Sequence, residues 1–221
     1  MMTALGTDYL GLIISAADAA FGGVQIFPVF SEGISIFFTK RKEQATEIFL
    51  EEMKRGNFDF SKVSQGDLVM IAFRTYRAAI EGAARVNLRL MAKVAAGMVE
   101  KHQTRPDLFL WYADMLSTLR REELVLLATL HRLTRTTELA KLRERGERPR
   151  EVKIRAIADL VPGTFPTELH LEAALGSLVR TGFVLFGGTI GEVGNFGITP
   201  LLDELMEYAS VEDALQQEPA T

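Results

Sequence analysis

Apolar positions along most of this chain repeat with the spacing of a helix rather than the alternation of a strand. Over residues 31–55, one face collects apolar side chains at intervals of three and four residues, interrupted only by the carboxylate of Glu52: Ala45, Ile48, Phe49 and Met53. Such a stripe predicts an amphipathic helix with one buried side. Another apolar helix is predicted over 8–21, where a glycine pair ends it. The N-terminal part is therefore expected to form a buried helical hairpin.

The longest helical pattern covers residues 64–101, where strong helix formers dominate. We predict one continuous helix there, starting after Ser64. Its second face carries a row at spacings of three and four residues: Arg74, Arg77, Glu81, Arg85 and Arg89. Residues at these spacings lie on one side of a helix. The row is interpreted as an exposed, salt-bridged face, and its four arginines are candidates for contacts with an acidic partner or with phosphate.

Shorter elements follow this helix. One helix is predicted after Pro106, another over 120–134, and a third after Pro149. The charged stretch 135–150 contains a glycine and a proline, and is interpreted as a mobile connection and a candidate domain boundary. Beyond it the pattern predicts helix, turn, helix, β-hairpin and helix.

A glycine-rich ribbon, GFVLFGGTIGEVGNFGITP over 182–200, joins the two strands of the predicted hairpin. We assign the wing of the hairpin to its centre: Gly187, Gly188, Gly191, Glu192 and Gly194. Glycine supplies the positive φ angles that hairpin turns need. A phosphate-binding loop is excluded, because no lysine follows Lys153 and the glycines do not have the GxGxxG spacing. The ribbon is expected to be a long, flexible tip.

The C-terminal pattern resembles a winged helix. The resemblance covers residues 118–208 and is carried by REELVLLATLHRL (121–133), ALGSLVRTGFV (174–184), the hairpin, and GITPLLDELMEYA (197–209). It implies a fold that often reads DNA through its second turn helix. Charge argues against that use here, because residues 151–210 hold 3 basic and 8 acidic side chains and forgo counterion release. We therefore expect a protein-contact or structural role for this module.

These patterns predict a mostly α fold, in which a helical bundle is followed by a small winged-helix-like module with one β-hairpin. We divide the chain into a helical domain over 1–117, the winged-helix-like module over 118–210, and a flexible acidic tail over 211–221. A chain of 221 residues is long enough to bury a proper core in such an arrangement.

The whole chain also resembles the abortive-infection alpha group of bacterial proteins. The segments that carry this resemblance are STLRREELVLLATL (117–130) and GITPLLDEL (197–205), together with the apolar N-terminal hairpin and the long central helix. The resemblance implies a bacterial protein related to phage exclusion, without a known enzymatic activity.

Charge is distributed unevenly along the chain. The net charge of −4 is made of about −3 over 1–60, +7 over 61–150 and −8 over 151–221. Solvated faces that attract one another, within the molecule or across an oligomer, account for such segregation, and a basic groove for an anionic partner is the alternative. The chain has no cysteine, which excludes disulfides and thiolate metal sites and suits a cytoplasmic protein.

A membrane contact is the second alternative. Residues 9–38 carry only Asp18 and Glu32 as charges, and a basic run follows at 40–42. The longest charge-free stretch, 19–31, has 13 residues, too few for a spanning helix, which needs about 20. The segment is therefore expected in a buried hairpin, with a peripheral membrane association as the other interpretation.

The sequence contains no catalytic constellation. His102, His131 and His170 are far apart, no HExxH motif is present, and no GxSxG elbow surrounds a serine. We expect no metal, no cofactor and no enzymatic activity. The prediction is an interaction protein that acts through protein contacts and forms a homo-oligomer; a nucleic-acid-binding regulator that uses the basic middle segment, and a membrane-associated protein that uses 9–38, are the alternatives.

Overall fold

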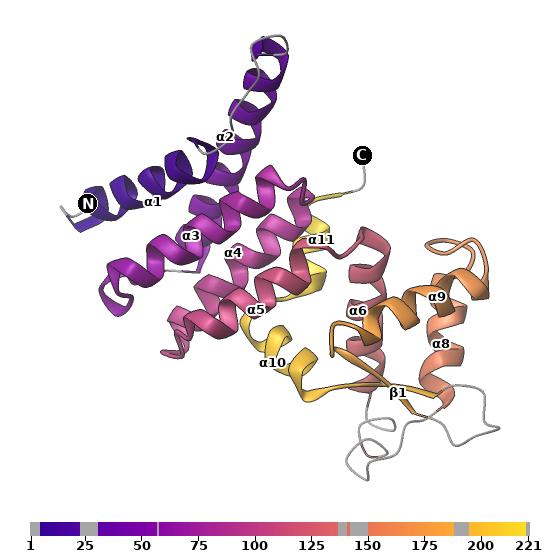
Figure 1. The fold of residues 1–221 in the computed structure, drawn as a ribbon. Coiled ribbons are helices and arrows are strands. Elements are labelled where there is room, and N and C mark those ends of the chain that lie inside the picture. Colours follow the sequence, from indigo (N-terminus) through magenta and orange to yellow (C-terminus); the bar gives the residue numbers. More distant parts are fainter. Residues whose placement is uncertain are drawn as a thin grey trace. The chain divides into compact units, whose positions relative to one another are not determined.

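The computed structural model of the chain describes residues 5–22, 31–56, 58–136, 141, 150–187 and 195–219. Within these residues the fold has ten α-helices, one short 3₁₀ helix and one antiparallel pair of strands (Figure 1). The predicted mostly α class with a single β-hairpin is confirmed. Among the described helices, none combines the length and the apolar character needed to cross a bilayer.

The chain divides into two compact units, Met1–Thr118 and Leu119–Thr221. The charged stretch 135–150, which we expected to mark a boundary, lies inside the second unit, so that expectation is wrong. The reason is packing: the helices on either side of this stretch, α6 (Arg121–Thr134) and α8 (Arg150–Leu160), lie against each other and share one core. Most of the stretch itself, 137–140 and 142–149, lies outside the described residues.

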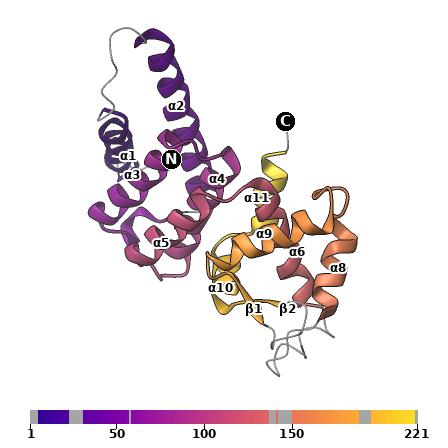
Figure 2. The same cartoon turned by 45° about the vertical axis from the view of Figure 1, so that its right-hand side comes forward.

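The first unit is a bundle of five helices: α1 (Leu5–Gly22), α2 (Ser31–Arg55), α3 (Gln65–Ile80), α4 (Arg85–Glu100) and α5 (Pro106–Ser117). Helix α1 packs chiefly along α3, while α2 packs on α4 and α3, and α5 covers the other side of α3 and α4. Figures 1 and 2 both show the N-terminal half of α2 extending past the other helices of this unit. The predicted N-terminal hairpin is therefore part of a bundle, and in the N-terminal half of α2 the described side chains from Ile36 to Lys40 are mostly exposed.

The continuous helix predicted over 64–101 is wrong, because the chain forms two helices there. Helix α3 begins after Ser64, whose Oγ accepts a hydrogen bond from the Asp67 backbone N–H at 3.1 Å, and ends at Ile80. Gly82 then adopts a φ of 98°, a left-handed conformation that only glycine takes readily. The turn reverses the chain, so that α3 and α4 pack against each other.

The second unit contains α6, α8, α9 (Glu168–Val179), β1 (Val184–Gly187), β2 (Asn195–Ile198), α10 (Pro200–Tyr208) and α11 (Val211–Gln217). The strands pair antiparallel, with Val184 opposite Ile198 and Gly187 opposite Asn195. The core is formed by apolar side chains from the helices and the start of β1, among them Leu124, Leu171, Leu178, Phe183, Val184, Leu202 and Leu205. Gly187 ends β1, and the other wing residues, Gly188, Gly191, Glu192 and Gly194, lie outside the described residues.

The flexible tail predicted over 211–221 is wrong for its first part, because α11 occupies Val211–Gln217. Ser210 caps this helix by accepting a hydrogen bond from the Asp213 backbone N–H at 3.1 Å, and Val211 and Ala214 are fully buried. The helix packs on α6, where the Arg121 guanidinium donates to the backbone oxygens of Leu215, at 3.2 Å, and Glu218. Two buried apolar contacts and a capped start outweigh the acidic composition of the segment.

Candidate interaction surface

The projecting helix α2 has two sides of different character. Its inner side buries Ala45, Ile48, Phe49 and Met53 against the bundle, as the apolar stripe predicted. Positions on the opposite side recur at spacings of four, three and four residues and are all exposed: Ile36, Lys40, Glu43 and Glu47. We call these four residues the outer row of α2. The row begins with an isoleucine that is 52% exposed and continues with one basic and two acidic side chains.

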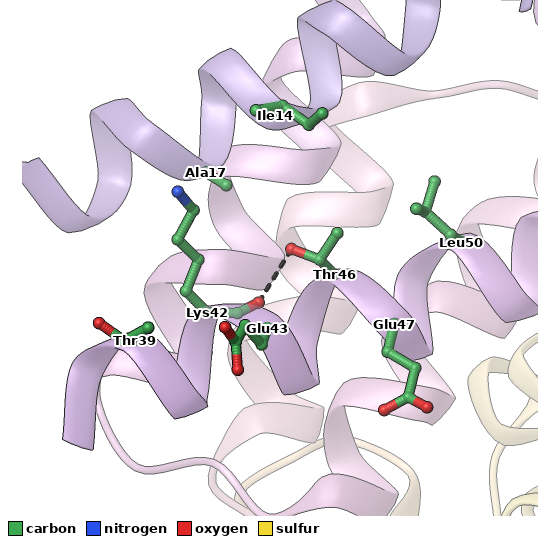
Figure 3. A pocket seen from close by; sticks show the side chains of 8 residues that line it. All are labelled: Ile14, Ala17, Thr39, Lys42, Glu43, Thr46, Glu47 and Leu50. Carbon is green, nitrogen blue, oxygen red and sulfur yellow. Dashed lines mark hydrogen bonds between the residues drawn. The ribbon is translucent and has the colours of Figure 1, made fainter. Parts of the chain in front are cut away.

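A groove runs beside the outer row, between α1 and α2 (Figure 3). It encloses about 460 Å³ and is lined by Ile14 and Ala17 from α1 and by Thr39, Lys42, Glu43, Thr46, Glu47 and Leu50 from α2. Lys42 reaches across to α1, where it pairs with Asp18. The hydroxyl of Thr46 donates back to the Lys42 carbonyl at 2.9 Å. Figure 3 shows Glu43 and Glu47 pointing away from α1, so the groove has apolar side chains within and carboxylates at its outer rim.

The neighbouring Phe37 lies on a different side of α2, because one residue along a helix turns the side chain by about 100°. Its ring is 51% exposed. The Arg41 guanidinium lies 5.7 Å from the centre of this ring, and Phe38 meets the same ring edge-on at 5.6 Å between centroids. Phe37 is therefore an exposed aromatic residue outside the outer row.

Tyr76 of α3 is fully buried in the same bundle. Burial raises the pKa of its hydroxyl, and the negative charge of Asp18 raises it further, against a hydrogen bond with Thr46 that lowers it. The phenol is therefore neutral in the physiological range.

The four candidate arginines do not form one exposed row, so that prediction is wrong. Arg74 and Arg77 lie on α3, whereas Arg85 and Arg89 lie on α4, because the turn at Gly82 separates them. Arg74 Nε donates to Asp114 Oδ1 of α5 at 2.8 Å, and Arg77 Nε donates to Glu81 Oε1, also at 2.8 Å. Arg85 is half-buried at the start of α4. The basic face expected from periodicity is thus divided between two helices and largely paired with carboxylates.

Arg89 belongs to a buried charge cluster around Glu52. Glu52 is 2% exposed and contacts Arg89, with Lys93 Nζ at 3.3 Å and Arg55 Nη1 at 3.6 Å. Arg89 also reaches Glu51 Oε2 at 3.0 Å. A buried carboxylate needs such partners, because an unpaired charge away from water is costly. The signal for this cluster was present in the sequence as the single carboxylate on the apolar stripe of α2.

In the second unit, an exposed face of α9 carries few charges. Three exposed positions recur at spacings of four and three residues and form the outer row of α9: Leu169, Ala173 and Gly176. Arg180 follows four residues later as the C-cap. Leu169 is 75% exposed. Lys153 of α8 is paired with Glu172 of α9, and its Nζ lies 3.7 Å from Glu168 Oε1. The exposed apolar positions of α9 were not predicted from the sequence, where the charge of 151–210 was the only signal considered for this module.

The three histidines lie in separate surroundings. His102 follows α4 with a φ of 56°, and its backbone N–H donates to the Val99 carbonyl, as expected for a residue at a helix end. His131 Nε2 lies 3.7 Å from Asp203 Oδ1, between α6 and α10. His170 Nδ1 is 2.8 Å from the Thr167 hydroxyl. In the part of the chain that the structure describes, no three His, Asp or Glu side chains lie close enough to hold a metal ion.

Comparison of the chain with protein-family models, with curated proteins and with solved structures gave no match.

Proposed function

We propose that this protein is a non-enzymatic interaction protein that works through contacts with other protein chains, including copies of itself. The observation that carries this proposal is the apolar outer row of α9. The elements of the second unit follow the order of a winged helix: α6, α8, α9, β1, β2 and α10. This order supports the assignment of a winged-helix-like module. In a winged helix, the helix in the place of α9 is the one that faces the partner.

The charge around α9 favours a protein partner over DNA. A helix that reads DNA offers Lys, Arg, Asn or Gln at its outward positions. Here those positions hold Leu169, Ala173 and Gly176 before Arg180. Lys153, the neighbouring base, is already paired with glutamates of α9. An exposed leucine among small side chains offers apolar area and lets a partner approach closely. A protein surface can bury such apolar area, whereas a phosphate backbone cannot.

Site-specific photo-crosslinking in living cells tests this proposal. A photoreactive amino acid replaces Leu169 in the full chain, and the matched control carries it at Asp213, an exposed position on α11. We expect protein adducts of discrete mass from position 169 and none of the same mass from position 213. Adducts with DNA from position 169, or no protein adduct there at all, would contradict the proposal.

A role in phage exclusion is part of the proposal, supported by the likeness of STLRREELVLLATL and GITPLLDEL to the abortive-infection alpha group. The absence of cysteine supports a cytoplasmic location for this role. Plating of a panel of phages on cells that carry the wild-type gene, the Leu169→Asp variant or an empty vector tests it. We expect fewer plaques only on the strain that carries the wild-type gene. Equal numbers of plaques on all three strains would contradict a role in phage exclusion.

A further inference from the structure

We infer that the outer row of α2 is a self-association surface, on which α2 of a second copy of this chain packs antiparallel about a twofold axis. The inference rests on the proposed function, because it names one of the protein partners and the surface that binds it.

Charge order selects the antiparallel arrangement. In a twofold interface, a residue i of one copy that meets residue j of the other implies the reverse contact as well. Placing Lys40 level with Glu47 of the second copy therefore forms two lysine–glutamate pairs, one at each end of the interface. A parallel twofold arrangement would instead place Lys40 against Lys40 and Glu47 against Glu47, which like-charge repulsion disfavours. Glu43 lies beside Glu43 of the other copy near the axis in both arrangements, so that contact opposes association equally and does not distinguish them.

The same register brings apolar groups together. With Lys40 level with Glu47 of the other copy, Ile36 lies one residue, about 1.5 Å along the axis, from the level of Leu50 of that copy. Leu50 lines the groove, and Ile14 of α1, itself exposed, lies across from it (Figure 3). The exposed Ile36 of each copy thus has an apolar recess to enter in the other copy. Removal of an isoleucine side chain from water is favourable, which fits an anchor residue.

The row fits a protein better than a lipid surface. Anionic headgroups attract clustered lysine and arginine, whereas Glu43 and Glu47 follow Lys40 directly on the exposed side. Of the neighbouring bases, Lys42 is paired with Asp18 and Arg41 lies over Phe37. Lys40 and Glu47 of the row complement a second copy of this chain, and the two glutamates of the row weaken attraction to an anionic lipid surface.

Measurement of solution mass by light scattering, over a range of concentrations of the full-length protein, is the first test. The wild type is expected at twice the chain mass of 24.5 kDa. Ile36→Asp is expected to move the protein toward the monomer, while Phe37→Asp, at an equally exposed position off the row, keeps the dimer. Circular dichroism checks that both variants fold. A monomeric wild type, or equal effects of the two variants, would overturn the inference.

Charge reversal provides a second test that does not depend on an apolar substitution. Lys40→Glu and Glu47→Lys are each expected to weaken self-association, because each places like charges together. Mixed one to one, the two variants restore both pairs, so a tagged Lys40→Glu chain retains the untagged Glu47→Lys chain. The double variant Lys40→Glu/Glu47→Lys is expected to dimerise again. Failure of the mixture to associate would refute the antiparallel arrangement.

The outcome separates this inference from the proposed function. If mass measurements show a monomer but position 169 still yields protein adducts, the α2 dimer is wrong and the interaction function stands. If the protein instead floats with vesicles of anionic lipid and both Ile36→Asp and Phe37→Asp abolish flotation, a membrane occupies this surface and the dimer is refuted.

Discussion

Glu52 and Glu123 show, at the scale of single residues, how this chain buries charge. Each is about 2% exposed, and each lies on a helix of a different unit. Glu52 is surrounded by Arg89, Lys93 and Arg55, whereas Glu123 folds back to accept a hydrogen bond from the Arg120 backbone N–H at 2.8 Å. In both cases charge-assisted contacts offset the cost of removing the carboxylate from water.

Replacement of Arg89 tests the first of these clusters. We expect Arg89→Met to lower the free energy of unfolding by about 3–5 kcal/mol, because it leaves Glu52 buried with fewer partners. Arg77→Met is the matched control, since that side chain is mostly exposed and its pair with Glu81 is worth at most about 1 kcal/mol. Urea unfolding of both variants measures the difference. Equal losses in the two variants would show that the buried cluster has no special weight.

The pH dependence of stability tests the role of Glu123. Burial raises the pKa of this carboxyl, but hydrogen bonds from Ser177 and from the Arg120 backbone, with the charges of Arg120 and Arg180, lower it by more, so the net pKa is lowered. A lowered folded-state pKa contributes stability above the unfolded value, near pH 4.3, and this contribution is lost as pH falls through the folded pKa. We expect Glu123→Gln to cost about 1–3 kcal/mol at pH 7.

The control for this prediction is the same comparison at low pH. The gap between wild type and Glu123→Gln in urea unfolding is expected to shrink as the solution is acidified below about pH 4. If the difference in free energy of unfolding stays constant from pH 7 to pH 3, the charge of Glu123 does not contribute to stability. The packing or hydrogen-bond geometry of the substituted amide would then account for the lower stability of the variant.

Glycines shape the helices of this chain in different ways. Gly82 breaks the long apolar pattern by taking a φ of 98°. Gly56 follows α2 where that helix approaches α4, and a β-carbon built at this position would lie 2.8 Å from the β-carbon of Ala96. Gly176 lies on the outward face of α9, where an added β-carbon meets nothing within 4 Å. The first two are required by backbone or packing, and the third is not.

Alanine substitution at two of these positions should have opposite effects. Gly56→Ala is expected to destabilise the protein by about 1–3 kcal/mol, because α2 and α4 must move apart to accept the methyl group. Gly176→Ala is expected to stabilise it by about 0.5–1 kcal/mol, since alanine has the higher helix propensity and the site is open. Thermal unfolding by calorimetry measures both. A stabilising Gly56→Ala would show that the close approach is relaxed in solution.

At the scale of the whole molecule, the chain consists of two units, each with its own buried core. The basic segment 61–150 contributes residues to both units, and part of it, 137–140 and 142–149, lies outside the described residues. Within the first unit, Arg74, Arg77 and Arg89 are paired with carboxylates of the same unit. Paired guanidinium groups release fewer counterions on meeting a polyanion, so they add little to nucleic-acid affinity.

Nucleic-acid binding is accordingly expected to be weak. At about 50 mM salt, where phosphate contacts are strongest, we expect no mobility shift of single- or double-stranded DNA or RNA at micromolar protein. The double variant Arg77→Ala/Arg85→Ala should behave like the wild type. A shift that weakens steeply with salt and is lost in the double variant would instead support the nucleic-acid-binding regulator.

Much of the fold could be predicted from the sequence because its causes are local. The start and end of α2, the entry of α5 at Pro106, the strands around the glycine-rich ribbon and the entry of α10 at Pro200 agree with the structure to within a few residues. Each depends on periodicity, capping or proline within a few positions of the boundary. Less of the candidate site could be predicted from the sequence. Periodicity indicated which side of α2 is buried, but not that the N-terminal half of this helix projects.

Distant contacts account for what the sequence analysis got wrong. A glycine within a good helical pattern is compatible with either a helix or a turn, and packing of α4 back on α3 selects the turn at Gly82. An acidic tail becomes helical at α11 because α6 offers a surface to bury Val211 and Ala214. Arg89 was predicted to be exposed, but it is buried because it pairs with Glu51 and Glu52 of α2. These partners lie nearly forty positions earlier in the chain, so local periodicity does not reveal them. Helix type and amphipathic face follow from neighbours along the chain, whereas burial and ion pairing follow from neighbours in space.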